Sequence, residues 1–261
     1  MSILTVQNLS KTFGGLTAVS GFHMELQRGE LVGLIGPNGA GKTTVFNLLT
    51  GVYRPTEGEI LLHFEGSSRP LQGKRPCHIC AEGVARTFQN IRLFRDLTAL
   101  DNLRIAMHQN VSYGTLTGLL HTGAFRRQEA ALERGALELL DRMGLYDKRD
   151  ELARNLSYGE QRHLEIARAL ATNPTLLLLD EPAAGMNPAE TAHLTELLGV
   201  LRREYDLTIL LIEHDMSLVM RICERIYVLD YGSVIAEGCP QEIQSNRRVV
   251  EAYLGEDAAY V

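Results

Sequence analysis

A glycine-rich segment near the start of the sequence has the residue types that bind phosphate. Residues 36–43 read Gly-Pro-Asn-Gly-Ala-Gly-Lys-Thr, which fits the pattern G-x-x-x-x-G-K-[ST]. Glycines let backbone N–H groups turn towards phosphate oxygens, and the helix expected to follow points its positive end at the same anion. Lys42 can reach the β- and γ-phosphates of a nucleotide, and the Thr43 hydroxyl can ligate Mg²⁺. The segment therefore predicts a nucleoside triphosphate site.

Two carboxylates follow an apolar run later in the chain. Residues 176–179 are four leucines between Pro174 and Pro182, and Asp180 and Glu181 come directly after them. A strand that ends in Asp180 would place this carboxylate at the Mg²⁺ position beside the phosphate loop, and Glu181 could activate a water as a general base. An acidic turn after a strand is common. The pair therefore indicates a catalytic site only in combination with the glycine-rich segment.

A third segment, 156–161, reads Leu-Ser-Tyr-Gly-Glu-Gln and precedes a stretch with helical periodicity. Ser157 can cap this helix, and the exposed backbone of 158–160 can bind an anion. On its own the hexamer indicates only the start of a helix.

The elements that must position these residues follow from turns and periodicity. Short strands interrupted by glycine are expected in 2–35, and a strand in 59–64 follows a turn, whereas the polar stretch 65–80 predicts a loop. Buried strands are expected at 176–180 and 208–212, and a hairpin at 225–237. Helical periodicity is found at 43–49, 100–145, 159–171, 188–204 and 217–223. This alternation of strands and helices favours an α/β fold.

Composition excludes several classes of protein. The 261 residues are 45% hydrophobic and 22% charged, which suits a folded domain with its own core. A net charge of −6 offers no basic excess for nucleic acid. Four cysteines are too few for a disulfide scaffold, and Cys77-His-Ile-Cys80 lacks the second pair of ligands that a structural zinc site needs. No secretory signal or membrane-spanning run is evident, so the chain is not expected to cross a bilayer by itself, although it could lie against a membrane protein.

In this order, the segments resemble the ATP-binding cassette (ABC) ATPase family over nearly the whole chain. Residues 157–161 resemble the family signature LSGGQ, with Tyr158 in place of the first glycine and Glu160 before the glutamine. Asp180 and Glu181 match the Walker B aspartate and the catalytic glutamate. Further matches are Gln89 with the Q-loop glutamine, His214 with the switch histidine, Phe13 with the aromatic residue that stacks on adenine, and 184–187 with the D-loop, where Asn187 replaces the usual aspartate. Taken alone, three of these residues have an ordinary interpretation: Gln89 as a solvated glutamine, His214 as a core histidine and Phe13 as a core phenylalanine.

The resemblance implies an α/β fold, a P-loop NTPase core with an N-terminal antiparallel β-subdomain in 1–91 and 166–261 and an inserted helical subdomain in 92–165. It also implies a head-to-tail dimer, in which each ATP lies between Lys42 of one subunit and the Ser157 segment of the other. The expected ATP-binding residues are Phe13, Gly36, Pro37, Asn38, Gly39, Ala40, Gly41, Lys42, Thr43, Thr44, Ser157, Tyr158, Gly159 and Glu160. The expected catalytic residues are Glu181, His214 and Gln89, and the expected Mg²⁺ ligands are Thr43, Gln89 and Asp180.

Four segments, 86–94, 180–188, 212–216 and 249–255, resemble the importer group for branched-chain or other hydrophobic amino acids, and the helical stretch with 123–127 also fits one of the two ATPase subunits of that system. This narrower resemblance implies an ATPase subunit on the inner face of the cell membrane. Its partners would be transmembrane permease subunits, a second ATPase of the same or a different chain, and a solute-binding protein. An ABC exporter, or an importer of urea or amides, would look much alike. Gln89 and residues 90–95 are expected to couple the ATP site to a permease, and the arginines of 86–104 are interpreted as surface charge.

Other ABC proteins fit less well. A DNA-repair ATPase would carry a long heptad insertion, which the stretch between Lys42 and Asp180 lacks. A translation factor of this family usually has two cassettes in one chain. A regulator that only binds nucleotide would lack the carboxylate of Glu181.

Overall fold

The computed structural model describes residues 1–64, 66–111 and 123–257. The chain divides into two compact units. The first contains Met1–Arg86 and Thr175–Val261, and the second contains Thr87–Pro174. The expected helical subdomain, 92–165, lies inside the second unit, which extends further at both ends. The part of the expected helical stretch at 112–122 lies outside the described residues.

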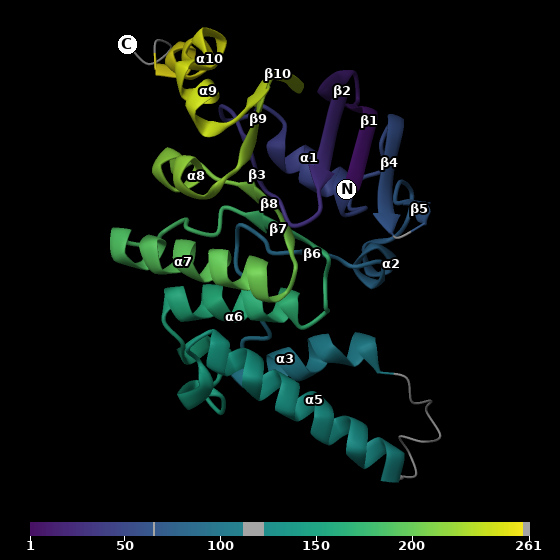
Figure 1. The fold of residues 1–261 in the computed structure, drawn as a ribbon, viewed down its shortest axis with the longest axis vertical. Coiled ribbons are helices and arrows are strands. Elements are labelled where there is room, and N and C mark those ends of the chain that lie inside the picture. The colour runs from purple at the N-terminus through teal and green to yellow at the C-terminus, as the bar shows by residue number, and fades with distance from the viewer. Residues whose placement is uncertain (65, 112–122, 258–261) are drawn as a thin grey trace. The chain divides into compact units, whose positions relative to one another are not determined.

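A six-stranded sheet in the order β10-β9-β3-β8-β7-β6 forms the centre of the first unit (Figure 1). Its strands are β3 (Leu31–Ile35), β6 (Val84–Arg86), β7 (Leu176–Asp180), β8 (Thr208–Ile212), β9 (Arg225–Asp230) and β10 (Ser233–Gly238). All neighbours pair in parallel except β9 and β10. Every residue of β3, β7 and β8 is buried, which explains why these strands are mostly apolar. Because these three strands are parallel neighbours, the loops that follow them meet at one edge of the sheet.

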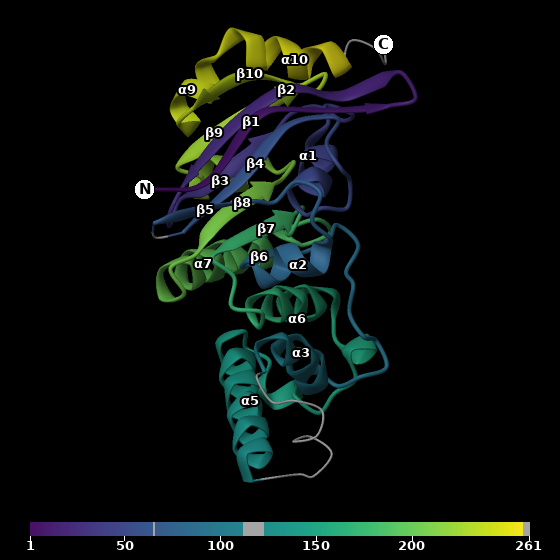
Figure 2. The same ribbon diagram turned by 90° about the vertical axis from the view of Figure 1, so that its right-hand side faces the viewer.

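A second sheet of the first unit is antiparallel, in the order β2-β1-β4-β5 (Figure 2). It contains β1 (Ser2–Phe13), β2 (Leu16–Gln27), β4 (Glu57–Phe64) and β5 (Ser67–Pro70). The predicted strands in 2–35 are present and are separated at Gly14 and Gly15 and at Gly29, but the short length expected of them was wrong for β1 and β2, which have 12 residues each. Gly21, with a positive φ of 56°, lies inside β2, where register shifts absorb it without ending the strand.

The predicted loop at 65–80 was also wrong in part, because it contains β5 and the helix α2 (Pro76–Ala81). All four residues of β5 are exposed, so the strand shows no alternation of apolar and polar residues. Its backbone pairs with β4 and thereby forms the strand. Pro76 occupies the first turn of α2, where its fixed φ suits a helix start.

The remaining helices of the first unit are α1 (Lys42–Leu49), α7 (Pro188–Glu204), α8 (Met216–Ile222), α9 (Pro240–Ser245) and α10 (Arg247–Asp257). Side chains cap two of them. Asn187 accepts hydrogen bonds from the backbone N–H groups of Ala189 and Glu190 at the start of α7, and Asp215 does the same for α8. Asn187, which stands where the D-loop usually has aspartate, thus caps α7, as an aspartate could.

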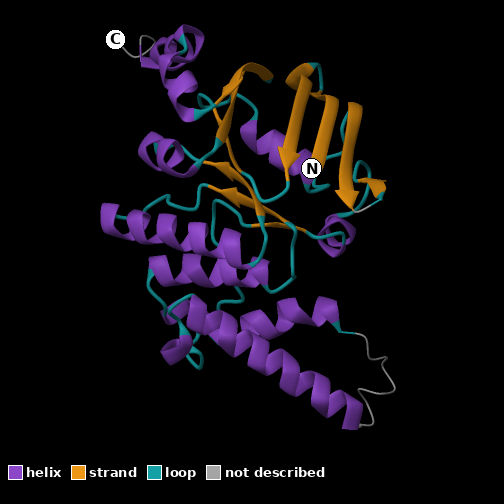
Figure 3. Ribbon diagram, viewed as in Figure 1, coloured by secondary structure: helices purple, strands orange, loops and turns teal. Residues whose placement is uncertain are grey.

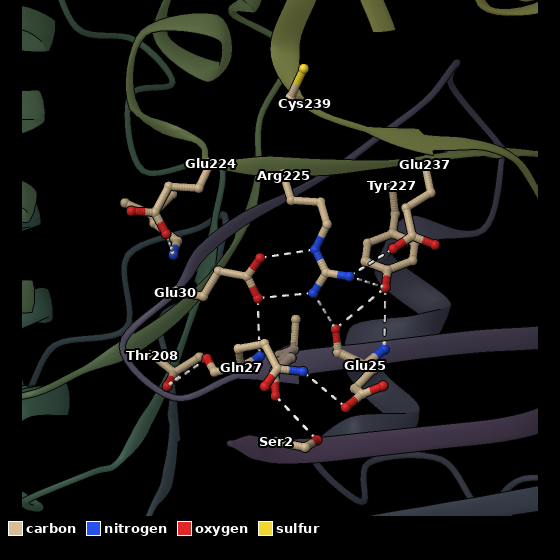
Figure 4. A network of polar contacts seen from close by, with 12 residues as sticks. Ser2, Glu25, Gln27, Glu30, Thr208, Glu224, Arg225, Tyr227, Glu237 and Cys239 are labelled. Atoms are coloured by element: carbon tan, nitrogen blue, oxygen red, sulfur yellow. Dashed lines mark hydrogen bonds and ion pairs between the residues drawn. The ribbon is translucent and has the colours of Figure 1, made fainter. Parts of the chain in front are cut away.

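Arg225 on β9 joins the two sheets of the first unit (Figure 4). Its Nε and Nη2 atoms donate to the Glu30 carboxylate at 2.9 Å each, and Nη2 also donates to the Glu25 carbonyl on β2 at 2.6 Å. Its Nη1 atom reaches Glu237 on β10 at 2.7 Å. These bonds raise the pKa of Arg225, and burial raises the pKa of the neighbouring Tyr227 to about 12. The network fixes the antiparallel sheet to the central sheet.

The main elements of the second unit are helices (Figure 3). They are α3 (Ala99–Met107), α5 (Gly123–Arg142) and α6 (Tyr158–Leu170), with short 3-10 helices η1 (His108–Asn110), η2 (Tyr146–Lys148) and η3 (Ala153–Asn155). α3 packs against both α5 and α6. Within the described parts of the chain, no helix has the length and apolar character that crossing a membrane requires.

Candidate nucleotide site

The phosphate-binding segment lies between the end of β3 and the start of α1. Gly36 and Gly41 have positive φ values of 149° and 105°. A Cβ atom at Gly36 would lie 1.9 Å from the Leu229 carbonyl oxygen, and one at Gly41 would lie 2.5 Å from the Ala18 carbonyl oxygen. Only glycine fits these two positions, because both the conformation and the space exclude a side chain. A Cβ atom at Gly39 would meet no atom within 4 Å, so this part of the loop lies open to a ligand.

Lys42 begins α1 and lies over this loop. Its side chain is buried, and its Nζ atom donates to the carbonyl oxygens of Gly36 and Pro37 at 2.5 and 2.7 Å. The positive end of α1, which begins with Lys42, Thr43 and Thr44, faces the same loop. The loop therefore combines a fixed ammonium group with a helix N-terminus, and both attract phosphate.

Asp180 ends β7 and forms a buried ion pair with Arg86, which ends β6. The Asp180 Oδ2 atom lies 2.6 Å from Arg86 Nη2, and both side chains are almost fully buried. Arg86 also donates to Asn47 Oδ1 at 2.7 Å and to Thr50 Oγ1 at 3.3 Å, and its guanidinium lies over the Phe46 ring. The interpretation of Arg86 as surface charge was wrong. Arg86 orients the carboxylate of Asp180 instead.

Glu181 and His214 lie side by side after β7 and β8. The distance from Glu181 Oε1 to His214 Nε2 is 2.6 Å. The Glu181 backbone has a positive φ of 48°, and its N–H donates to the Ile212 carbonyl at 2.9 Å. This conformation turns the chain sharply at the end of β7 and leaves the carboxylate beside His214, whose ring is about half exposed.

Glu213 belongs to the same edge of the sheet, although the sequence analysis did not select it. Its buried carboxylate accepts hydrogen bonds from the backbone N–H groups of Ala183 at 2.7 Å and His214 at 3.0 Å. Burial raises the pKa of Glu213, and the charge of Glu181 raises it further. Glu213 therefore joins the segment after β7 to the segment after β8. The feature of the sequence that could have identified Glu213 is its position directly after an apolar strand.

Phe13 lies at the end of β1 and forms an aromatic pair with Tyr53. The ring centroids are 5.1 Å apart at an interplanar angle of 75°, and both rings are partly exposed. The Lys11 Nζ atom lies 4.8 Å from the Phe13 centroid. From the sequence, Phe13 was predicted as the residue that stacks on adenine, and Tyr53 was not selected. The Tyr53 ring contacts the Phe13 ring in an edge-on geometry.

Ser157 and Glu160 form a capping box at the start of α6, in the second unit. Ser157 Oγ accepts from the Glu160 N–H at 3.4 Å, and the Glu160 carboxylate accepts from the Ser157 N–H at 2.9 Å. Glu160 also contacts Lys148 at 2.5 Å, and this bond lowers the pKa of Glu160. The cap that the sequence predicted at Ser157 is confirmed, and it includes Glu160.

Gln89 follows β6 and lies in the second unit with Ser157, Tyr158, Gly159 and Glu160. The Arg162 side chain on α6 donates to the Gln89 carbonyl at 3.0 Å. Sequence analysis missed Arg162. The contacts of Gln89 with a metal ion, and those of residues 157–160 with ATP, remain predictions.

The oxygen donors of the first unit fit a magnesium ion bound together with a nucleotide. Mg²⁺ typically takes one or two oxygen ligands from protein and completes its shell with water and phosphate oxygens. Thr43 offers a hydroxyl and Asp180 a carboxylate that Arg86 holds in place. In the described part of the chain, no three His, Cys, Asp or Glu side chains gather as a metal site of their own.

Comparisons with known proteins agree with this geometry. The family model described as ABC transporter matches residues 19–184, and the model described as branched-chain amino acid ATP-binding cassette transporter matches residues 233–259. The chain is 53% identical to the high-affinity branched-chain amino acid transport ATP-binding protein LivG of Escherichia coli K12, over 97% of this chain and 98% of LivG. It is 48% identical to BraF of Pseudomonas aeruginosa, a protein of the same description, with the same coverage.

Solved structures of ATP-binding cassettes are also similar to this chain. The ADP conformation of MJ1267, an ATP-binding cassette of an ABC transporter, superposes with a TM-score of 0.83 at 31% identity, over 98% of this chain and 99% of MJ1267. A dimeric post-hydrolysis state of the cassette MJ0796, bound to ADP and phosphate, superposes with a TM-score of 0.75 at 25% identity, over 91% and 99%.

The chain belongs to the ABC transporter family and is an ATP-hydrolysing subunit of that family. Its C-terminal segment places it in the branched-chain amino acid group. The predicted fold class and family are thereby confirmed.

Proposed function

We propose that this chain hydrolyses ATP to drive the uptake of branched-chain or other hydrophobic amino acids. The proposal is supported by the high identity with LivG and BraF along nearly the whole chain. It is also supported by the match of residues 233–259, which lie outside the segment matched by the general ABC model. The partners would be transmembrane permease subunits, which hold the chain at the inner face of the cell membrane, and a solute-binding protein.

The contact between Glu181 and His214 is the observation that best supports a hydrolytic role. His214 Nε2 lies 2.6 Å from Glu181 Oε1, a contact that would orient the Glu181 carboxylate as the general base for the attacking water. Lys42 and the first turn of α1 bind the phosphates of ATP, with Phe13 under the adenine. Thr43, Asp180 and Gln89 are the residues that would hold Mg²⁺, which would supply neutralisation of the phosphate charge.

The second half of each site would come from another ATPase subunit. Ser157, Tyr158, Gly159 and Glu160 form an α6 start whose Ser157 and Tyr158 are exposed. In a head-to-tail dimer this helix N-terminus would face the γ-phosphate held by Lys42 of the other subunit, and its N–H groups would stabilise the charge that develops there. MJ0796, which was solved as a dimer, supports a dimeric state. The second subunit can be a copy of this chain or a different ATPase.

Replacement of Glu181 by glutamine tests the hydrolytic role. Glutamine keeps the size of the side chain but cannot accept the proton, so we expect ATP turnover of the permease complex to fall by about 10²–10⁴-fold while ATP binding persists. ATPase rates and the ATP dissociation constant would be measured on the same preparation. Glu196→Gln, at an exposed position of α7, is the matched control and should behave as wild type. Wild-type turnover in Glu181→Gln would place the base elsewhere.

The transported solute requires its own experiment. In proteoliposomes with the permease and the solute-binding protein, we expect ATP inside the vesicles to drive uptake of labelled leucine or valine. Uptake restricted to urea or amides, or ATP-driven efflux, would contradict the amino-acid assignment.

A further inference from the structure

A buried ion pair on α6 holds the segment that contains Gln89. Arg162 and Glu165 lie about one turn apart on this helix, with their charged atoms 2.7 Å apart and side chains 0% and 2% exposed. Burial raises the pKa of Glu165. Two charged groups at such a buried site require hydrogen-bond partners with good geometry, because their removal from water is costly.

The backbone of residues 88–92 supplies these partners. Glu165 Oε1 accepts hydrogen bonds from the N–H groups of Phe88 at 3.3 Å and Arg92 at 3.1 Å. Arg162 donates through Nη1 to the Phe88 carbonyl at 2.8 Å and through Nη2 to the Gln89 carbonyl at 3.0 Å. Two side chains of α6 thus bond four backbone groups on both sides of Gln89.

The same guanidinium reaches the start of α6. Arg162 Nη2 donates to the Tyr158 hydroxyl at 3.2 Å, and the Tyr158 ring lies 5.9 Å from the guanidinium carbon. Tyr158 directly follows the cap residue Ser157 and is 46% exposed. One side chain therefore contacts both the Gln89 segment and the residue that replaces a glycine of the family signature.

We propose that Arg162 and Glu165 are positioning residues for ATP hydrolysis, which join the Gln89 segment and residues 157–160 into one body. A nucleotide that contacts residues 157–160 of one subunit then also fixes the position of Gln89 in that subunit. Binding at one ATP site of a dimer therefore affects the other site. This inference rests on the proposed roles of Gln89 and of residues 157–160. An apolar pair would fill the same space with little loss of stability, but it would leave the four backbone groups without these bonds.

The double variant Arg162→Met with Glu165→Leu separates positioning from folding. In the full chain we expect a melting temperature close to that of wild type, while hydrogen exchange at the Phe88 and Arg92 amides becomes about 10-fold faster or more. In the complex with the permease, kcat for ATP should fall about 10-fold and KM should change less than about 3-fold, because ATP binding itself is retained. A folded double variant with wild-type exchange and wild-type kcat would overturn the proposal.

Two further variants keep the test decisive. Arg162→Lys retains a charge beside Glu165 but cannot bond both carbonyl groups and Tyr158 at once, so kcat should fall while the chain stays folded; an unchanged kcat would count against the proposal even if the double variant fails to fold. Arg154→Met removes an exposed ion pair with Asp96 in the same unit and should change neither exchange nor kcat.

The exchange measurement needs no nucleotide and therefore examines the contacts alone. Undiminished ATPase activity in Gln89→Ala would instead remove the proposed role of Gln89, and with it the catalytic part of this inference. Failure of the proposed contacts and failure of the proposed role of Gln89 would thus give different results.

Discussion

Glu181 adopts a left-handed backbone conformation that residues other than glycine rarely occupy. Such a conformation costs on the order of 1–3 kcal/mol and persists only where the surrounding structure holds it. Here the Ile212 carbonyl and the His214 ring hold the residue on both its backbone and its side chain. Strain, a buried neighbouring ion pair and a half-exposed histidine thus coincide at one turn, as expected where a carboxylate must be oriented for chemistry.

Tyr53 gives a prediction at the same scale. Its ring supports Phe13 from the edge, and an aromatic pair of this kind contributes about 0.5–1.5 kcal/mol beyond its buried area. Tyr53→Leu should therefore raise the dissociation constant for ATP by about 2–10-fold, because Phe13 loses its preferred orientation. Calorimetric titration with ATP would measure the change, with Tyr205→Leu, on another partly exposed ring, as control. Unchanged affinity would show that Phe13 needs no support from Tyr53.

Among the elements, those that position the phosphate loop are predictable from sequence, and several contacts between them are not. Strands β7 and β8 have the predicted bounds, because a short, mostly apolar run between turn residues is typical of a buried strand. β5 escaped prediction because all its side chains face solvent. Arg86 was assigned to the surface because a charged residue is usually exposed, and its partner Asp180 lies far along the chain. Pairing between distant residues is a property of the fold that local sequence does not carry.

The link between the ends of β7 and β8 makes stability depend on pH. Burial and the nearby Glu181 raise the pKa of Glu213 above that of an unfolded glutamate. Its contribution to the free energy of unfolding is therefore fully present below about pH 4.3 and is lost as pH rises through the native pKa. Glu213→Gln should show a smaller fall in stability above this pH than wild type. Urea unfolding at a series of pH values would measure it, and Glu196→Gln should follow wild type. Parallel pH profiles for Glu213→Gln and wild type would contradict the assignment.

At the scale of the whole molecule, the proposed catalytic groups are divided between the two units. Lys42, Asp180, Glu181 and His214 belong to the first, and Gln89 with residues 157–160 belongs to the second. The chain first passes between them directly after Arg86, the residue that holds Asp180. The second unit also carries Phe94, which is 47% exposed, while its backbone N–H and carbonyl bond the buried Asn102 side chain on α3. An exposed ring on a fixed backbone suits contact with a permease.

Phe94→Asp should accordingly weaken assembly with the permease or lower amino-acid uptake by about 10-fold, while ATP binding stays near normal. A charge placed in an apolar contact is costly to bury, which gives the direction of the effect. Co-purification of the permease and uptake in proteoliposomes would measure it. Tyr146→Asp, at a similarly exposed ring of the second unit, is the matched control. Normal assembly and uptake in Phe94→Asp would remove residues 90–95 from the coupling path.

The order of strands in the central sheet has a consequence for synthesis. β3, all of whose residues are buried, pairs with β8 and β9, yet these neighbours leave the ribosome about 170 and about 190 residues later. At roughly 5–20 residues per second, β3 and the glycine-rich loop behind it wait on the order of 10–40 s before their partners exist. During this interval an apolar strand with two open edges is exposed to other nascent chains, and a chaperone that covers it would protect the future phosphate loop as well.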